Sequence, residues 1–179
     1  MRTVKSICLA ALAGAALIAT LAKPAFAAEE TVISAFSAWR GVGHLVQTSA
    51  TEAMFVGSLD GTVYVNTDKG PVEAGQMVCP AVVRIDLASG LQTGTGNCTM
   101  TAEDGARLFS ELNCTGVHLV GCSGEMKLTG GTGRFEGVAG GGAFTLRSSL
   151  NDIELTSAAS AQETAHGIIF WPELRYTLP

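Results

Sequence analysis

Three histidines, His44, His118 and His166, are the side chains of this 179-residue chain best suited to acid–base work near neutral pH or to metal binding. No His-x-His or His-x-x-x-His spacing brings two of them together, so we expect no metal site and no cofactor. A surface or structural histidine is the simpler interpretation for each. His44 is the best candidate for a catalytic base, because it lies near Trp39 and Arg40 at a predicted strand start. His118 falls in a predicted turn and is expected to be exposed.

The carboxylates are scattered and form no evident acid–base pair. Glu52 and Glu163 could point inward near the rim of a sheet, whereas the alternation in its strand predicts that Glu125 faces outward. Glu136 is expected to form an ion pair with Arg134. No Gly-x-Ser-x-Gly motif is present, so a serine hydrolase triad has little support.

Four of the five cysteines follow residue 70: Cys79, Cys98, Cys114 and Cys122. An even number in an exported chain predicts two disulfides, and three pairings are open. Zinc is the alternative, but the chain has no Cys-x-x-Cys. A turn signal at 87–90 lies midway between the first two cysteines, and glycines lie between the last two. These turns favour Cys79–Cys98 and Cys114–Cys122.

The N-terminal segment has the three parts of a bacterial signal peptide. Arg2 and Lys5 precede an apolar stretch at 7–21, and Ala-Phe-Ala at 25–27 forms a cleavage site. The apolar stretch is shorter than the ~20 residues of a membrane span. We therefore expect a signal peptide at 1–27, a single domain at 28–179, no stable membrane insertion, and a periplasmic or secreted location.

The predicted mature chain is acidic. The formal charge of −5 becomes −8 when Arg2, Lys5 and Lys23 leave with the leader, because 16 acidic residues remain against eight basic ones. No basic cluster is present, so we expect no nucleic-acid partner.

Period-two alternation marks the elements that must position these residues. In the stretch 78–87, one face carries Cys79, Ala81, Val83, Ile85 and Leu87, and the other carries Val82, Arg84 and Asp86. Segments 143–150 and 173–178 alternate in the same way. Further strands are expected at 31–39, 43–51, 54–65, 93–101, 106–114 and 121–129, whereas Asn151 to Thr164 is expected to be a loop or short helix. Eight or nine short antiparallel strands predict a barrel or a sandwich.

Seven glycines occur between Leu128 and Phe144. Glycine accepts positive φ and close backbone approach, which suits a sharp corner between strands. We place the corner at Gly130, Gly131, Gly133 and Gly137. A phosphate-binding loop is disfavoured, because the third glycine of a Gly-x-Gly-x-x-Gly comes one residue late and no Lys-Ser/Thr follows.

The motif Gly-Gly-Thr-Gly-x-Phe at 130–135, followed by a glycine-rich strand, resembles the allene oxide cyclase and dirigent superfamily. The resemblance implies a single eight-stranded antiparallel β-barrel of the calycin type, often trimeric. Such a barrel can fill with side chains or hold one small ligand. It supplies no set of catalytic residues that this sequence matches.

We therefore expect a barrel that binds a small apolar molecule. Its pocket is placed near Trp39, His44, Phe170 and Trp171, because these residues gather at predicted strand ends in a chain poor in aromatics. Neighbours in a strand face opposite sides, so one of Phe170 and Trp171 should lie outside, at a mouth or between the subunits of a dimer or trimer. The alternative is a cyclase- or isomerase-like enzyme, or a dirigent-like guide, that steers a reactive apolar intermediate. A purely structural role for the barrel is the simplest hypothesis.

Overall fold

The computed structural model describes residues 29–179. The predicted signal peptide at 1–27 lies outside the described residues. Eight strands and one short 3-10 helix follow in chain order: β1 (Glu30–Gln47), β2 (Glu52–Thr67), β3 (Gly70–Asp86), β4 (Leu91–Thr101), β5 (Arg107–Val117), β6 (Gly121–Gly131), η1 (Gly133–Phe135), β7 (Ala139–Ser157) and β8 (Ser160–Thr177).

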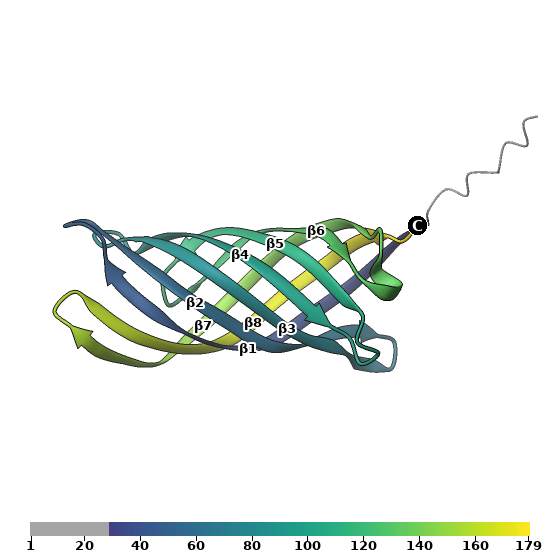
Figure 1. Cartoon of the computed structure of the whole chain (residues 1–179), viewed down its shortest axis with the longest axis horizontal. Helices are drawn as coiled ribbons and strands as arrows, with labels where there is room; N and C mark the ends of the chain where they lie inside the picture. The colour runs from purple at the N-terminus through teal and green to yellow at the C-terminus, as the bar shows by residue number, and fades with distance from the viewer. Residues whose placement is uncertain (1–28) are drawn as a thin grey trace, which may run out of the picture.

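Each strand pairs antiparallel with the next, and β8 returns to pair with β1, so the sheet closes into one barrel (Figure 1). The closing seam runs from the pair Glu30–Thr177 to the pair Val46–Ser160. This architecture confirms the predicted eight-stranded antiparallel β-barrel. Closure leaves the barrel wall without a free edge.

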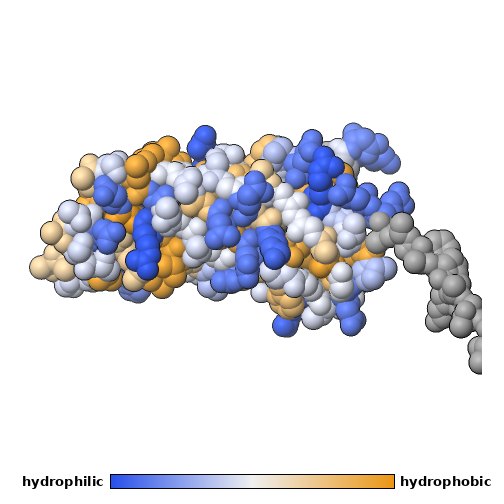
Figure 2. Space-filling view, turned by 90° about the horizontal axis from the view of Figure 1, so that it is seen from above, coloured by the Kyte–Doolittle hydropathy of each residue, from blue (hydrophilic) through white to orange (hydrophobic). Residues whose placement is uncertain are grey.

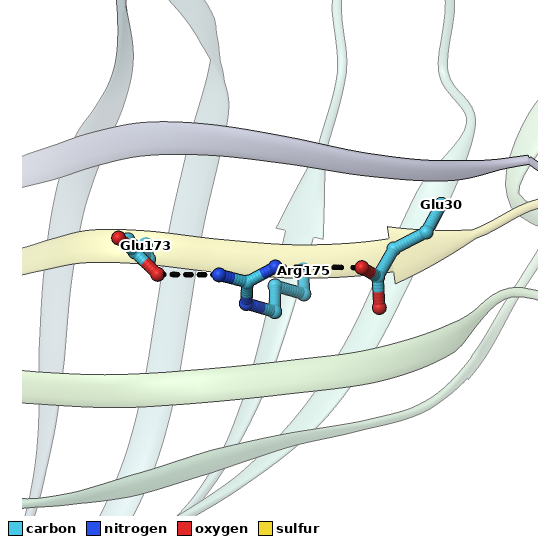
Figure 3. Close-up of polar contacts among 3 residues, drawn as sticks. All are labelled: Glu30, Glu173 and Arg175. Carbon is cyan, nitrogen blue, oxygen red and sulfur yellow. Dashed lines mark hydrogen bonds and ion pairs between the residues drawn. The ribbon is translucent and has the colours of Figure 1, made fainter.

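A surface ion-pair cluster lies on the seam (Figure 3). Arg175 of β8 donates to Glu173 at 2.6 Å and to Glu30 of β1 at 3.4 Å. The hydrogen bond from Arg175 to Glu173 raises the pKa of the guanidinium. All three side chains are at least half exposed, so solvent weakens the cluster, and backbone pairing carries the seam.

The barrel has two ends that differ in what they carry. Both described chain ends, the β2–β3 and β4–β5 turns and η1 lie at one end, called here the terminal end. The β1–β2, β3–β4, β5–β6 and β7–β8 turns lie at the other, called the distal end. The β7–β8 hairpin extends past the barrel there (Figure 1). In Figure 2 the distal end lies to the left, and apolar and polar residues are mixed over the face shown.

Side chains alternate between the barrel interior and solvent, as expected for a half-buried sheet. In β3, Cys79 and Ile85 are buried and Val82, Arg84 and Asp86 are exposed, which confirms the predicted faces up to the end of the strand. The prediction was wrong for Leu87, which lies just past the end of β3 and is 46% exposed. Glu125 of β6 is exposed, as predicted.

Several predicted boundaries were wrong. β3 begins at Gly70 and β8 at Ser160, well before the predicted starts at 78 and 173. Residues 31–39 and 43–51 were predicted as separate strands, but β1 runs through both to Gln47. Gly43 faces inward where a Cβ would collide with the Phe55 ring at 2.5 Å, so this glycine admits an aromatic neighbour and does not mark a turn. Asn151 to Thr164, predicted as a loop or short helix, belongs to the β7–β8 hairpin, with a tight turn between Ser157 and Ser160. Pairing with β8 overrides the weak strand propensity of that polar segment.

The glycine corner joins β6 to β7 through η1, as predicted. Gly133 has φ of +60°, in the left-handed region that favours glycine. The predicted Arg134–Glu136 ion pair was wrong, since Arg134 bonds Asp104 of the β4–β5 turn at 3.1 Å. The turn of η1 carries the guanidinium toward the neighbouring loop and over the Phe135 ring, 4.9 Å from its centroid.

Both predicted disulfides are present: Cys79–Cys98 joins β3 to β4, and Cys114–Cys122 joins β5 to β6. Two disulfides fit an oxidising compartment. Within residues 29–179, no helix is long and apolar enough to cross a membrane.

Candidate functional site

The barrel interior holds two cavities, one at each end. The terminal cavity measures about 320 Å³ and the distal cavity about 110 Å³. The paired residues Ser37 and Ile169 line neither cavity and are almost completely buried between them. We call this constriction of the barrel interior the waist. Cys79 lines the distal cavity and its bonded partner Cys98 lines the terminal cavity, so this disulfide crosses the waist. The two cavities are therefore separate candidate sites.

The terminal cavity has a mostly apolar lining, to which Arg134 is the charged contributor. Its wall includes Met77, Met100, Met126, Leu128, Trp171 and Leu174. Methionine side chains adapt to ligands of irregular shape. Phe135 of η1 and Val138 also contribute, so the glycine corner forms part of the wall at this end.

A few polar groups interrupt that apolar wall. The Trp171 side chain is 2% exposed, and its indole Nε1 has no hydrogen-bond partner among the described residues. A buried donor without a partner is costly and calls for an explanation such as a water or a ligand. Ser110 and Tyr176 add hydroxyl groups to the lining.

The distal cavity combines an aromatic wall with charged chemistry. Trp39, Phe55 and Phe144 line it. Glu163 of β8 also faces it and is only 5% exposed. A carboxylate in such a place needs a partner, because burying an unpaired charge is costly.

His118 supplies that partner from the β5–β6 turn. Its Nε2 lies 3.1 Å from Glu163 Oε2, and its Nδ1 lies 3.1 Å from Gln92 Oε1. Gln92 belongs to β4 and Glu163 to β8, and these strands stand four apart in a ring of eight, so they form opposite walls. The three side chains therefore make a hydrogen-bonded bridge across the distal mouth.

The protonation of the bridge depends on how the amide of Gln92 is turned. With its oxygen toward the ring, both ring nitrogens of His118 must donate, which requires the charged imidazolium. With its NH₂ toward the ring, neutral His118 accepts from Gln92 and donates to Glu163. Either arrangement presents a carboxylate and an imidazole to the cavity, which is a general acid–base pair within reach of a bound molecule.

The turn that carries His118 is strained. Leu119 has φ of +63°, and it is the non-glycine residue with positive φ in the described part of the chain. The left-handed conformation costs a residue with a side chain roughly 1–2 kcal/mol. Such strain concentrates at functional sites, and here Leu119 lines the same cavity as His118.

The residues predicted to share one pocket do not come together. Trp39 lines the distal cavity and Trp171 the terminal cavity, on opposite sides of the waist. His44 is exposed on the outer face of β1, and Phe170 is 41% exposed on the outer face of β8. The inward phase of Trp171 forces Phe170 outward, as predicted for one member of that pair.

His118, expected to be exposed, instead points into the barrel with 18% of its side chain accessible. Both Glu52 and Glu163 were candidates for an inward orientation. Glu52 is exposed, whereas Glu163 faces the barrel interior. The inward orientation of Glu163 could have been predicted from its position in the strand. It lies on the same face as Ala165, Ile169 and Trp171, all of which are buried. Within residues 29–179, no three His, Cys, Asp or Glu side chains are grouped closely enough to hold a metal ion.

Comparisons with solved structures give a likeness of shape. No protein-family model and no curated protein match the chain. A solved structure of a pterocarpan synthase dirigent protein aligns with 82% of this chain and 94% of its own, at 15% sequence identity and a TM-score of 0.30. Both values are too low to support a conclusion about function.

Proposed function

We propose that this protein binds a small apolar molecule in the terminal cavity. The observation that carries the proposal is a cavity of about 320 Å³ inside a closed barrel, walled by methionine, leucine and aromatic side chains. That volume is at the lower end of the range for ligand pockets, which runs from about 300 to 1,000 Å³. Trp171 contributes its aromatic ring to this wall.

N-phenyl-1-naphthylamine, a neutral fluorescent probe, tests the proposal. We expect it to bind the wild-type protein and to quench Trp emission, with Trp171→Phe removing most of the quenching because that indole lines the cavity. Ala74→Phe places a ring in the cavity and should weaken binding at least tenfold. Ala38→Phe is the matched control on the outer face of β1 and should leave binding unchanged.

Equal probe affinity in Ala74→Phe and wild type would contradict binding at the terminal end. Failure of the wild-type protein to bind this probe or any neutral apolar compound of similar size would leave a structural role for the barrel.

A second candidate function is a cyclase- or isomerase-like reaction, or dirigent-like steering of a reactive intermediate. The buried His118–Glu163 pair favours it, since such a pair can move a proton within a cavity that shields the intermediate from water. Cyclopentenone in D₂O provides an assay, because proton exchange at its acidic C–H positions is visible by NMR. Acceleration by the wild type and its loss in Glu163→Gln would support this function, and exchange at the buffer rate would exclude proton abstraction from this enone.

A further inference from the structure

We propose that the distal cavity is a second, independent ligand site, and that it takes a compact neutral alcohol whose hydroxyl group is held by Glu163. The site is separate from the proposed apolar site, since the waist at Ser37 and Ile169 lies between the two cavities. Neither proposal depends on the other.

The volume limits the size of the ligand. The distal cavity measures about 110 Å³. An apolar protein cavity of about 150 Å³ is known to bind benzene, which has six heavy atoms. The distal cavity is somewhat smaller, so by proportion it takes a skeleton of about four or five carbon atoms against Trp39, Phe55 and Phe144, with the head group at the mouth.

The polar end of the cavity selects the head group. Glu163 Oε2 is taken by His118, whereas Oε1 has no hydrogen-bond partner among residues 29–179. A carboxylate oxygen is an acceptor, so the ligand must supply a donor. A hydrogen bond to a charged acceptor contributes more than one between neutral groups, and we expect it to raise the affinity about tenfold or more.

Charge separates an alcohol from the other possible donors. An anionic ligand would meet the Glu163 carboxylate at close range and be repelled. An ammonium head group would have to lose its hydration in an aromatic cavity, which is unfavourable, while His118 already pairs with the carboxylate. A neutral hydroxyl group donates one hydrogen bond and adds no charge, so it is the class that this site fits.

The route to the cavity passes the bridge. Gln92, His118 and Glu163 cross the distal mouth, so a ligand entering from that end meets these groups before it meets the aromatic wall. The hydroxyl group of a bound alcohol therefore remains at the mouth while its carbon skeleton lies deeper. Phe144 lies on the wall near the waist and sets the depth that the skeleton can reach.

Three probes of matched size test the site: cyclopentanol, cyclopentane and cyclopentylammonium. Titrations of ¹⁵N-labelled protein followed by amide shifts give both affinity and location. We expect cyclopentanol to bind at least tenfold more tightly than the other two, and to shift the amides of Gly94 and Gly96, which line the distal cavity. The amides of Ala74 and Val138, which line the terminal cavity, should not move with it.

Substitutions at Glu163 separate the hydrogen bond from the cavity. Glu163→Gln should reduce the preference for cyclopentanol over cyclopentane several-fold, and Glu163→Leu should abolish it while cyclopentane still binds. Retained cyclopentane binding also shows that the variant is folded. Glu125→Gln, on the outer face of β6, is the matched control and should keep the wild-type preference.

Three results would overturn the proposal. They are equal affinity for cyclopentanol and cyclopentane in the wild type, an unchanged preference in Glu163→Leu, and shifts confined to residues of the terminal cavity. Tighter binding of cyclopentylammonium than of cyclopentanol would overturn the choice of a neutral head group.

Discussion

Asp86 at the β3–β4 turn shows how a single hydroxyl group changes an exposed carboxylate. The Ser89 hydroxyl donates to Asp86 Oδ1 at 2.6 Å, and the Ser89 backbone N–H donates to the same oxygen at 2.8 Å. These hydrogen bonds lower the pKa of Asp86 below its ordinary value of 3.8. Because the folded-state pKa is the lower one, the contribution to stability is complete above pH 3.8 and is lost as the pH falls through the folded-state value.

Ser89→Ala should therefore raise the pKa of Asp86 toward 3.8. A carboxyl ¹³C titration by NMR measures the change directly. Ser89→Thr keeps both donors and should leave the value low. The variant Ser89→Ala should be less stable than wild type at neutral pH and equal to it at a pH below the folded-state pKa. An Asp86 titration that is identical in Ser89→Ala and wild type would show that the hydroxyl group has no effect.

Glu163 and His118 differ in how far the sequence determines them. The inward orientation of Glu163 follows from its phase in β8, which alternation alone could have decided. The orientation of His118 depends on the left-handed conformation of Leu119, and leucine gives no hint of positive φ. The pairing of the two residues was also hidden, because 45 positions separate them and only closure of the barrel brings them together.

At the scale of elements, the corner between β6 and β7 depends on backbone conformation. Gly133 has φ of +60°, and a Cβ there would lie 3.2 Å from the Ala106 Cβ. We expect Gly133→Ala to lower the free energy of unfolding by roughly 1–3 kcal/mol, the cost of a side chain in a sparsely populated backbone region. Urea unfolding measured by circular dichroism checks the value.

Gly94→Ala is the matched control for that substitution. Gly94 lies in β4 without positive φ, and a Cβ there would meet the Cys114 Sγ and the Val83 Cγ2 at 3.4 and 3.5 Å, which are ordinary contact distances. The control should keep wild-type stability within about 0.5 kcal/mol, as is usual for a substitution without such a strain mechanism. Equal losses in both variants would contradict a role for the left-handed conformation.

The strands themselves were largely predictable, because alternation of apolar and polar residues is a local property. The β7–β8 hairpin was not predicted. Residues 151–157 are all exposed, Ile153 and Leu155 included, and the segment is held by its pairing with β8. The cysteine pairings followed from turn positions. The two separate cavities did not follow from any local pattern, because they depend on which interior side chains meet across the barrel.

At the scale of the whole molecule, the two disulfides cross-link neighbouring strands, one across the waist and the other beside the distal cavity. They close loops with sequence separations of 19 and 8 residues. On the chain-entropy estimate each contributes about 2–3 kcal/mol to the free energy of unfolding. We expect the processed protein to show no titratable thiol in denaturant without reductant, and reduction to lower its stability by a comparable amount for each bond.

Thiol titration and urea unfolding with and without reductant measure both effects. Replacing Cys114 and Cys122 together with alanine should leave the Cys79–Cys98 bond as the remaining reducible link. One or two reactive thiols in the denatured, unreduced protein would contradict the pairing.

The seam between β1 and β8 also sets when the protein can fold. It joins residues 30–46 to residues 160–177, so the sheet cannot close until β8 is available to pair with β1. Folding rates fall as contacts become more distant in sequence, because the entropy of closing a long loop must be lost before the contact forms. A chain emerging from the ribosome therefore cannot close its sheet until β8 has been synthesised, and β1 lacks that partner strand until then.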